Sequence, residues 1–191
     1  VITVNSPAKE GLAIPTEAEL VAVLKEVVAS EIKPFEDNVK KEPLISEDVV
    51  LKGSPVKKSK LNEAMGTTEW TLKNGIQVIV KQTPYEADAI NIEAVADGGA
   101  AIFSDEDYYS AQMLSSVMSM SGISKFSASD LRKQLSGKNA RVNVGVGTYQ
   151  HAIEGTAALK DAETMFQLMY LNFTAPRFSE DDFATLMKRY D

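Results

Sequence analysis

Apolar residues beyond about residue 67 recur with a period of two in some segments and at helical spacing in others. The period of two predicts strands at residues 70–72, 76–80, 90–94 and 142–146, the last continuing into a partner strand near Ile153. Asn74-Gly75 separates the first two strands and is the strongest short-range hairpin signal. Helical spacing predicts helices at residues 109–121, 127–135, 165–173 and 179–190. This mixture indicates an α+β fold, a largely antiparallel sheet covered on one face by helices.

Capping residues support the later helices. Ser127 and Ser179 are each followed by a helical pattern and are expected to be N-caps. Pro176 ends the helix at 165–173. The apolar positions of these helices are Leu131, Leu135, Met165, Phe166, Met169, Phe173, Phe183, Leu186, Met187 and Tyr190.

Residues 1–33 form a separate pattern, a short strand at 1–4 followed by an amphipathic helix. Thr16 and Glu19 have the spacing of a capping box. The apolar face of this helix consists of Leu20, Val23, Leu24, Val27 and Val28. Pro34 ends the segment. A strand and one helix bury too little surface to form a core alone, so this face is expected to pack on something outside the segment.

Residues 34–66 contain prolines, glycines and the lysine pairs Lys40-Lys41 and Lys57-Lys58, with scattered apolar residues. This composition predicts an extended linker along a surface. Acidic residues are interspersed with the lysines, which favours a solvated linker over a ligand site.

The charge and composition exclude several classes of function. The 191 residues carry a net charge of −7, which repels phosphate backbones and argues against nucleic-acid binding. The longest aliphatic run, residues 20–24, is too short to span a membrane. Cysteine is absent, which removes disulfides and thiolate metal sites. The chain starts at Val1 without an initiator Met or a signal segment, and we expect it to be a piece of a longer protein.

Candidate chemistry is sparse. The single histidine, His151, lies in a predicted strand with no carboxylate at ligand-like spacing, and we expect it to be half-exposed and hydrogen-bonded on a sheet. The acidic runs 105–107 and 180–182 precede or begin helices and are expected to interact with helix dipoles rather than calcium. Neither glycine-rich piece, 97–99 or 145–147, opens onto a helix as a phosphate loop does.

The order of the motifs resembles the M16 (pitrilysin or insulinase-like) zinc peptidases. Residues 70–78, Trp-Thr-Leu-Lys-Asn-Gly-Ile-Gln-Val, resemble the family's opening strand pair, Leu-x-Asn-Gly-(apolar)-x-Val. Asp97-Gly98-Gly99 with the helix after it, and residues 175–179, Ala-Pro-Arg-Phe-Ser, also fit the family. Residues 126–138 resemble the second half of large bacterial members, in which two M16 units are fused.

The resemblance implies a degenerate zinc motif. The family's His-x-x-Glu-His lies on the first helix of the catalytic unit, where two histidines bind zinc and the glutamate is the general base. The matching positions here are Gln112, Ser115 and Ser116, and no shift of register recovers two histidines. The sequence therefore predicts no catalytic and no metal-ligating residue in this chain.

The resemblance divides the chain into three parts. Residues 1–33 would be the end of a preceding M16 domain, 34–66 an inter-unit linker, and 67–191 a non-catalytic M16-like domain. The implied parent is a zinc metalloendopeptidase whose other half holds zinc, and the implied partners are its other M16 domains and a peptide substrate. Family resemblance alone suggests a periplasmic location.

Two alternatives remain. One is a catalytically dead M16-like scaffold or inactive partner subunit, which a His-x-x-Glu-His motif upstream of Val1 would exclude. The other is an independent hydrolase that uses His151.

Overall fold

The computed structural model describes residues 3–5, 11, 13–30 and 42–189. The chain divides into two compact units, residues 1–38 and 39–191. Within the described parts, no helix has both the length and the apolar character needed to cross a membrane. Residues 1–2 of the strand predicted at 1–4, and Pro34, lie outside the described residues, and Thr3 and Val4 are not in a strand.

The first unit contains helix α1, Glu17–Ala29. The predicted capping box is confirmed, since Glu19 N–H donates to Thr16 Oγ1 at 3.4 Å and Thr16 N–H donates to Glu19 Oε2 at 2.7 Å. No residue of the helix is buried, and Val23 and Val28 are 56% and 83% exposed. The helix therefore forms from local signals, and its apolar face lies largely in solvent within this chain.

The second unit begins its regular structure with a three-stranded antiparallel sheet, β1-β2-β3. Strand β1 spans Val56–Asn62, β2 Thr67–Leu72 and β3 Gln77–Val80. The predicted hairpin at Asn74-Gly75 joins β2 and β3, with Trp70 opposite Val78. Strand β1, which lies in the segment predicted as a linker, was not anticipated from the sequence.

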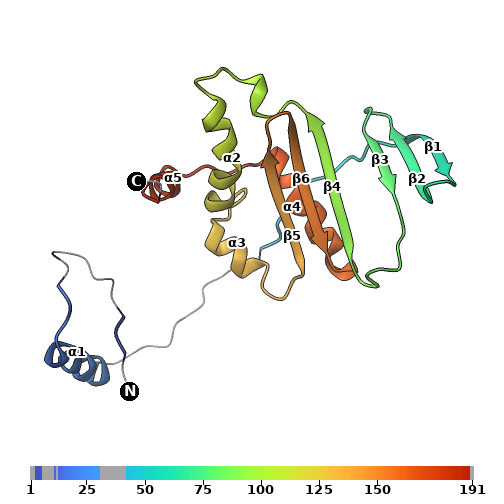
Figure 1. Ribbon diagram of the computed structural model, residues 1–191. Helices are drawn as coiled ribbons and strands as arrows, with labels where there is room; N and C mark the ends of the chain where they lie inside the picture. The colour runs from blue at the N-terminus through green and yellow to red at the C-terminus, as the bar shows by residue number, and fades with distance from the viewer. Residues whose placement is uncertain (1–2, 6–10, 12, 31–41, 190–191) are drawn as a thin grey trace. The chain divides into compact units, whose positions relative to one another are not determined.

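A second antiparallel sheet has the order β4-β6-β5, so the structure contains two sheets where the pattern suggested one. The strands are β4 Ile90–Asp97, β5 Ala140–Val146 and β6 Gln150–Ala157. Helix α4, Ala162–Thr174, lies behind this sheet in Figure 1. Met165 of α4 is fully buried and packs with Ala140 and Ala157, while Glu154 on the alternate side of β6 is exposed. Helix α4 thus covers one face of this sheet.

The exposed side of α4 differs from the expected pattern. Met165, Leu168 and Leu171 are buried, whereas Phe166 and Phe173 are 52% and 73% exposed. The predicted helix is confirmed, but its apolar positions Phe166 and Phe173 lie outside the buried stripe. A helix buries only one stripe, and in α4 the smaller aliphatic residues occupy that stripe.

Three further helices complete the unit: α2 Tyr108–Ser121, α3 Ala128–Gln134 and α5 Glu180–Met187. The predicted N-caps are confirmed, because Ser127 Oγ accepts from Asp130 N–H and Ser179 Oγ from Asp182 N–H, both at 3.2 Å. Two short 3-10 helices, η1 Ala100–Ile102 and η2 Leu159–Asp161, precede α2 and α4. Leu186 of α5 is buried, while Phe183 is 47% exposed and Tyr190 lies outside the described residues.

A second apolar cluster includes a residue from the predicted linker. Leu44 is 9% exposed and packs with residues of the α2–α3 loop and of α4, namely Ile123, Phe126, Leu168 and Leu171. The described part of the segment 42–66 is thus integrated into the second unit through Leu44 and β1.

Candidate functional site

Helix α2 carries the three positions that the sequence analysis matched to the zinc motif, and its N-terminal end is held against the β5–β6 turn. Ala100 N–H donates to Gly147 O and Ala101 N–H donates to Thr148 O, both at 2.8 Å. The hydroxyls of Tyr108 and Thr148 lie 3.3 Å apart. These hydrogen bonds attach the segment between β4 and α2 to the β5–β6 turn and so fix the position at which α2 begins.

Glycine makes this close approach possible. Gly99 has φ +69°, and a Cβ at this position would lie 2.5 Å from Gly147 O. Any larger residue would force the turn away from β5 and β6. Gly98 and Gly99 of the Asp97-Gly98-Gly99 motif thus serve close backbone packing against β5 and β6.

Gln112, Ser115 and Ser116 occupy α2 at spacings that place them on one side of the helix. Gln112 is exposed, and its Nε2 donates to the Tyr108 hydroxyl at 3.2 Å. Ser115 and Ser116 are half-buried. The amide and hydroxyl oxygens of these three side chains are neutral and would be weak metal ligands. None of the three side chains is an imidazole or a carboxylate.

This donor set does not fit zinc, which proteins bind through imidazole, thiolate or carboxylate ligands. In the part of the chain that the structure describes, no group of three or more His, Cys, Asp or Glu side chains could hold a metal ion. The residues present therefore offer no zinc site on α2.

His151 lies on β6 and is half-buried, as the sequence predicts. Its Nε2 accepts a hydrogen bond from Gly99 N–H at 3.2 Å. The ring also packs against Gly98, where a Cβ would lie 2.8 Å from Nε2. His151 thus supports the turn that precedes α2, a structural use that leaves Nε2 engaged with the backbone.

The acidic runs are placed at helix starts. Asp107 is the N-cap residue of α2, and its carboxylate accepts from Ser104 Oγ at 2.9 Å. Glu180, Asp181 and Asp182 form the first turn of α5, where their charge is favourable beside the positive end of the helix dipole.

An open depression lined by Asp97 and residues 147–150 lies beside the β5–β6 turn.

Comparisons with known proteins identify the fold. No protein-family profile matches this sequence, and no curated protein matches it significantly. Among solved structures, the periplasmic protease PqqL from Escherichia coli aligns with a TM-score of 0.72 and 20% sequence identity over 92% of this chain. A mutant of the ferredoxin protease FusC, solved with Arabidopsis ferredoxin, aligns with a TM-score of 0.64 and 20% identity over 89%.

The aligned region is a small part of both neighbours. This chain spans 19% of the length of each of those two proteins. At 20% identity the likeness shows the fold, and it agrees with the order of motifs found in the sequence. The chain therefore has an α+β fold that, over most of its length, is similar to part of each of these two protease structures.

Proposed function

We propose that this chain is a non-catalytic segment of an M16-type zinc metalloendopeptidase. In this proposal it helps to form the chamber around a peptide substrate, which zinc-activated water in the other half of the parent protein cleaves. The single observation that carries the proposal is helix α2. It lies in an M16-like fold, yet offers Gln112, Ser115 and Ser116 where the motif requires two histidines and a glutamate.

The domain division follows from the same proposal. Residues 1–33 end a preceding M16 domain and 67–191 belong to the second half. Residues 34–66 connect the two in sequence, and their described part, 42–66, packs on the second half through Leu44 and β1. The exposed apolar side chains of α1 support this division, because a helix with Val23 and Val28 in solvent lacks the partner that such a face normally packs against. A periplasmic location is part of the proposal, and the E. coli neighbour named as a periplasmic protease is compatible with it.

The alternative is an M16-like scaffold, or the inactive subunit of a two-chain protease, with no zinc anywhere in its own chain. Both proposals use the same fold and the same degenerate α2. They differ in whether His-x-x-Glu-His lies upstream of Val1.

The deciding experiment measures the intact mass and the zinc content of the protein purified from its own cells, together with peptide hydrolysis. A mass well above 20.8 kDa with about one zinc per chain is the expected result. A large mass without zinc would favour the scaffold. A mass of 20.8 kDa with bound zinc would overturn both proposals, since it would place a metal site in this chain.

A matched set of variants in the active parent tests the non-catalytic assignment. Replacing Gln112, Ser115 and Ser116 together by alanine should leave kcat unchanged, because alanine is compatible with a helix and none of the three contacts the reacting atoms in this proposal. Replacement of the upstream zinc-ligating histidines should abolish turnover. A large loss of kcat in the triple-alanine variant, with folding intact, would refute the assignment.

A further inference from the structure

Residues 42–46, here called the strap, attach an irregular piece of chain to the second unit. The strap contains no helix or strand. Its main apolar contact is Leu44, which is 9% exposed within the cluster of Ile123, Phe126, Leu168 and Leu171. Burial of this leucine side chain is the main apolar contribution to the attachment.

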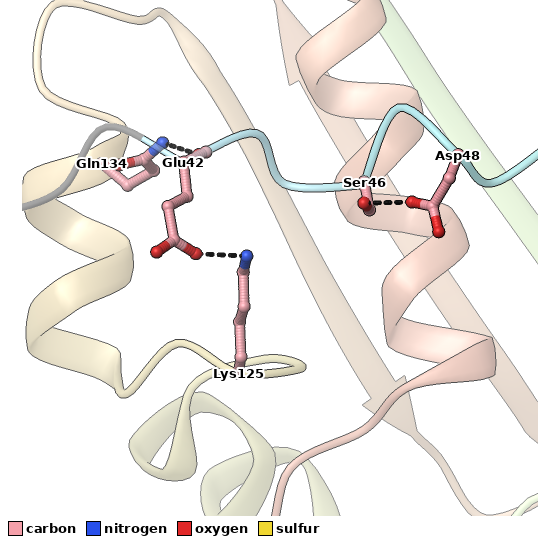
Figure 2. Close-up of polar contacts among 5 residues, drawn as sticks. All are labelled: Glu42, Ser46, Asp48, Lys125 and Gln134. Atoms are coloured by element: carbon pink, nitrogen blue, oxygen red, sulfur yellow. Dashed lines mark hydrogen bonds and ion pairs between the residues drawn. The ribbon is translucent and has the colours of Figure 1, made fainter.

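Two polar contacts reinforce this packing from α3 and the loop before it. Figure 2 shows Gln134 Nε2 donating to the backbone oxygen of Glu42, and Lys125 Nζ paired with Glu42 Oε2. The side chains of Lys125 and Glu42 are 50% and 43% exposed. Solvent and salt therefore weaken this ion pair, and Leu44 with the Gln134 hydrogen bond holds the strap.

The chain after the strap is attached again only near β1. Residues 47–53 are all exposed, and Val49 N–H bonds within the turn to Ser46 O at 3.0 Å. The next hydrogen bonds to the body come from Asn74 N–H to Ser54 Oγ at 3.0 Å and from Lys73 N–H to Pro55 O at 2.9 Å. The strap is thus a local attachment that is separated from the sheets by an exposed segment.

We propose that the strap is a releasable anchor, which leaves the apolar cluster while both sheets and the helices of the second unit stay folded. Among residues 42–189, release moves the most N-terminal attachment point from Glu42 to Ser54, twelve residues further along the chain. Twelve extended residues reach up to about 40 Å. The strap therefore controls whether residues 42–53 are attached to the folded body. The proposal does not depend on the proposed function, although in a two-half protein this length would set the connection between the halves.

The physical basis is the difference between local and global opening. Releasing the strap breaks the apolar contacts of Leu44 and Ile45 and the polar contacts of Glu42, whereas exposing α4 breaks the whole core. The strap should therefore open far more often than the cluster to which it binds.

Thiol reactivity tests this in the complete chain, which contains no cysteine. Leu44→Cys and Leu168→Cys each place one buried thiol in the same cluster, at positions 9% and 4% exposed. Val50→Cys, at an 80% exposed position, supplies the unprotected reference rate. We expect Leu44→Cys to react with a thiol reagent at least about a hundredfold faster than Leu168→Cys. We expect its rate to show much less dependence on urea, since strap release exposes less surface.

Additional changes separate the strap from the core. Gln134→Met removes the donor to Glu42 O without altering the aliphatic cluster, and should raise the reaction rate of Leu44→Cys by about tenfold while leaving Leu168→Cys unchanged. Lys52→Met changes an exposed residue and should alter neither rate. Hydrogen exchange at the Val49 amide of the unmodified chain gives a measurement that needs no cysteine variant, and it should be much faster than exchange in β5.

The proposal is overturned if Leu44→Cys and Leu168→Cys react at the same rate with the same urea dependence. It is also overturned if the Val49 amide exchanges only as fast as the amides of β5. Either result would make the strap an integral part of the core that opens only with global unfolding.

Discussion

Replacement of Met165 by alanine tests the packing between α4 and the sheet β4-β6-β5. Met165 is fully buried and lies against Ala140 and Ala157, with Met169 beside it. The alanine neighbours have no side chain long enough to fill the space that a shorter residue would leave. Met165→Ala should therefore create a cavity under the sheet.

The expected cost is about 3–4 kcal/mol in the free energy of unfolding of the second unit, within the range of about 2–5 kcal/mol for buried methionine-to-alanine changes. For a unit of this size, that corresponds to a decrease in Tm of about 6–16 °C. Phe166→Ala is the matched control, since Phe166 is the next residue of the same helix but is 52% exposed. Its cost should be about 1 kcal/mol.

A second substitution makes the test specific to this contact. A Cβ at Gly155 of β6 would lie 2.9 Å from Met165 Sδ and 3.1 Å from its Cγ. Gly155→Ala alone should therefore overpack the site and cost about 1–3 kcal/mol. In the Met165→Ala background those atoms are gone and the new methyl group partly fills the cavity, so the double variant should be more stable than the sum predicts by about 1 kcal/mol or more.

Urea unfolding followed by Trp70 fluorescence gives these free energies, because Trp70 is the sole tryptophan and reports on the second unit. Far-UV circular dichroism on the same samples checks that the transitions coincide. Additive costs for Gly155→Ala and Met165→Ala, or equal costs for Met165→Ala and Phe166→Ala, would refute the packing described for α4.

Three further outcomes are expected. Gly122→Ala should strongly destabilise the second unit, because Gly122 has φ +84° and a Cβ there would lie 2.3 Å from Phe126 O. Gly137→Ala is the control, since Gly137 has a similar φ of +80° but open space around it. Its free energy of unfolding, measured by chemical denaturation, should decrease by only about 1 kcal/mol. Hydrogen exchange should be faster throughout α1 than in β5, since no residue of α1 is buried; equal protection in a proven monomer would contradict this. Two hydrogen bonds from Thr16, first from its backbone N–H and second from its hydroxyl, lower the pKa of the Glu19 carboxyl. These bonds therefore stabilise α1 fully at pH values above the unfolded-state pKa of Glu19. Their stabilisation is lost as the pH falls through the lower pKa of the folded state. Circular dichroism should show less helix at low pH, and Glu19→Gln should remove that part of the pH dependence.

Local signals in the sequence predicted most of the regular elements. The capping box of α1 and the N-caps Ser127 and Ser179 act within three residues of themselves, and the Asn74-Gly75 turn requires only its two flanking strands. Such interactions depend little on the rest of the fold, so they can be recognised from spacing alone. The half-buried, hydrogen-bonded state of His151 was likewise correctly predicted.

The candidate site was predictable in part. The absence of histidine and glutamate from α2 is a property of the sequence, and it needs no structure. The hydrogen bonds that Ala100, Ala101 and Tyr108 form with the β5–β6 turn were not predicted. They join residues about 40 to 50 positions apart and therefore leave no periodic pattern in the sequence.

The sequence by itself determined the secondary-structure order from β2 to α5, the caps that begin several helices and the lack of zinc-ligating residues on α2. Only the tertiary structure decided that Val56–Asn62 is a strand, since its lysine-rich sequence resembles a linker and its pairing with β2 makes it regular. The tertiary structure also decided which side of α4 is buried and that Leu44 joins a distant cluster. These features depend on contacts between residues far apart in the chain, and the free energy of such contacts is not encoded in any local window of the sequence.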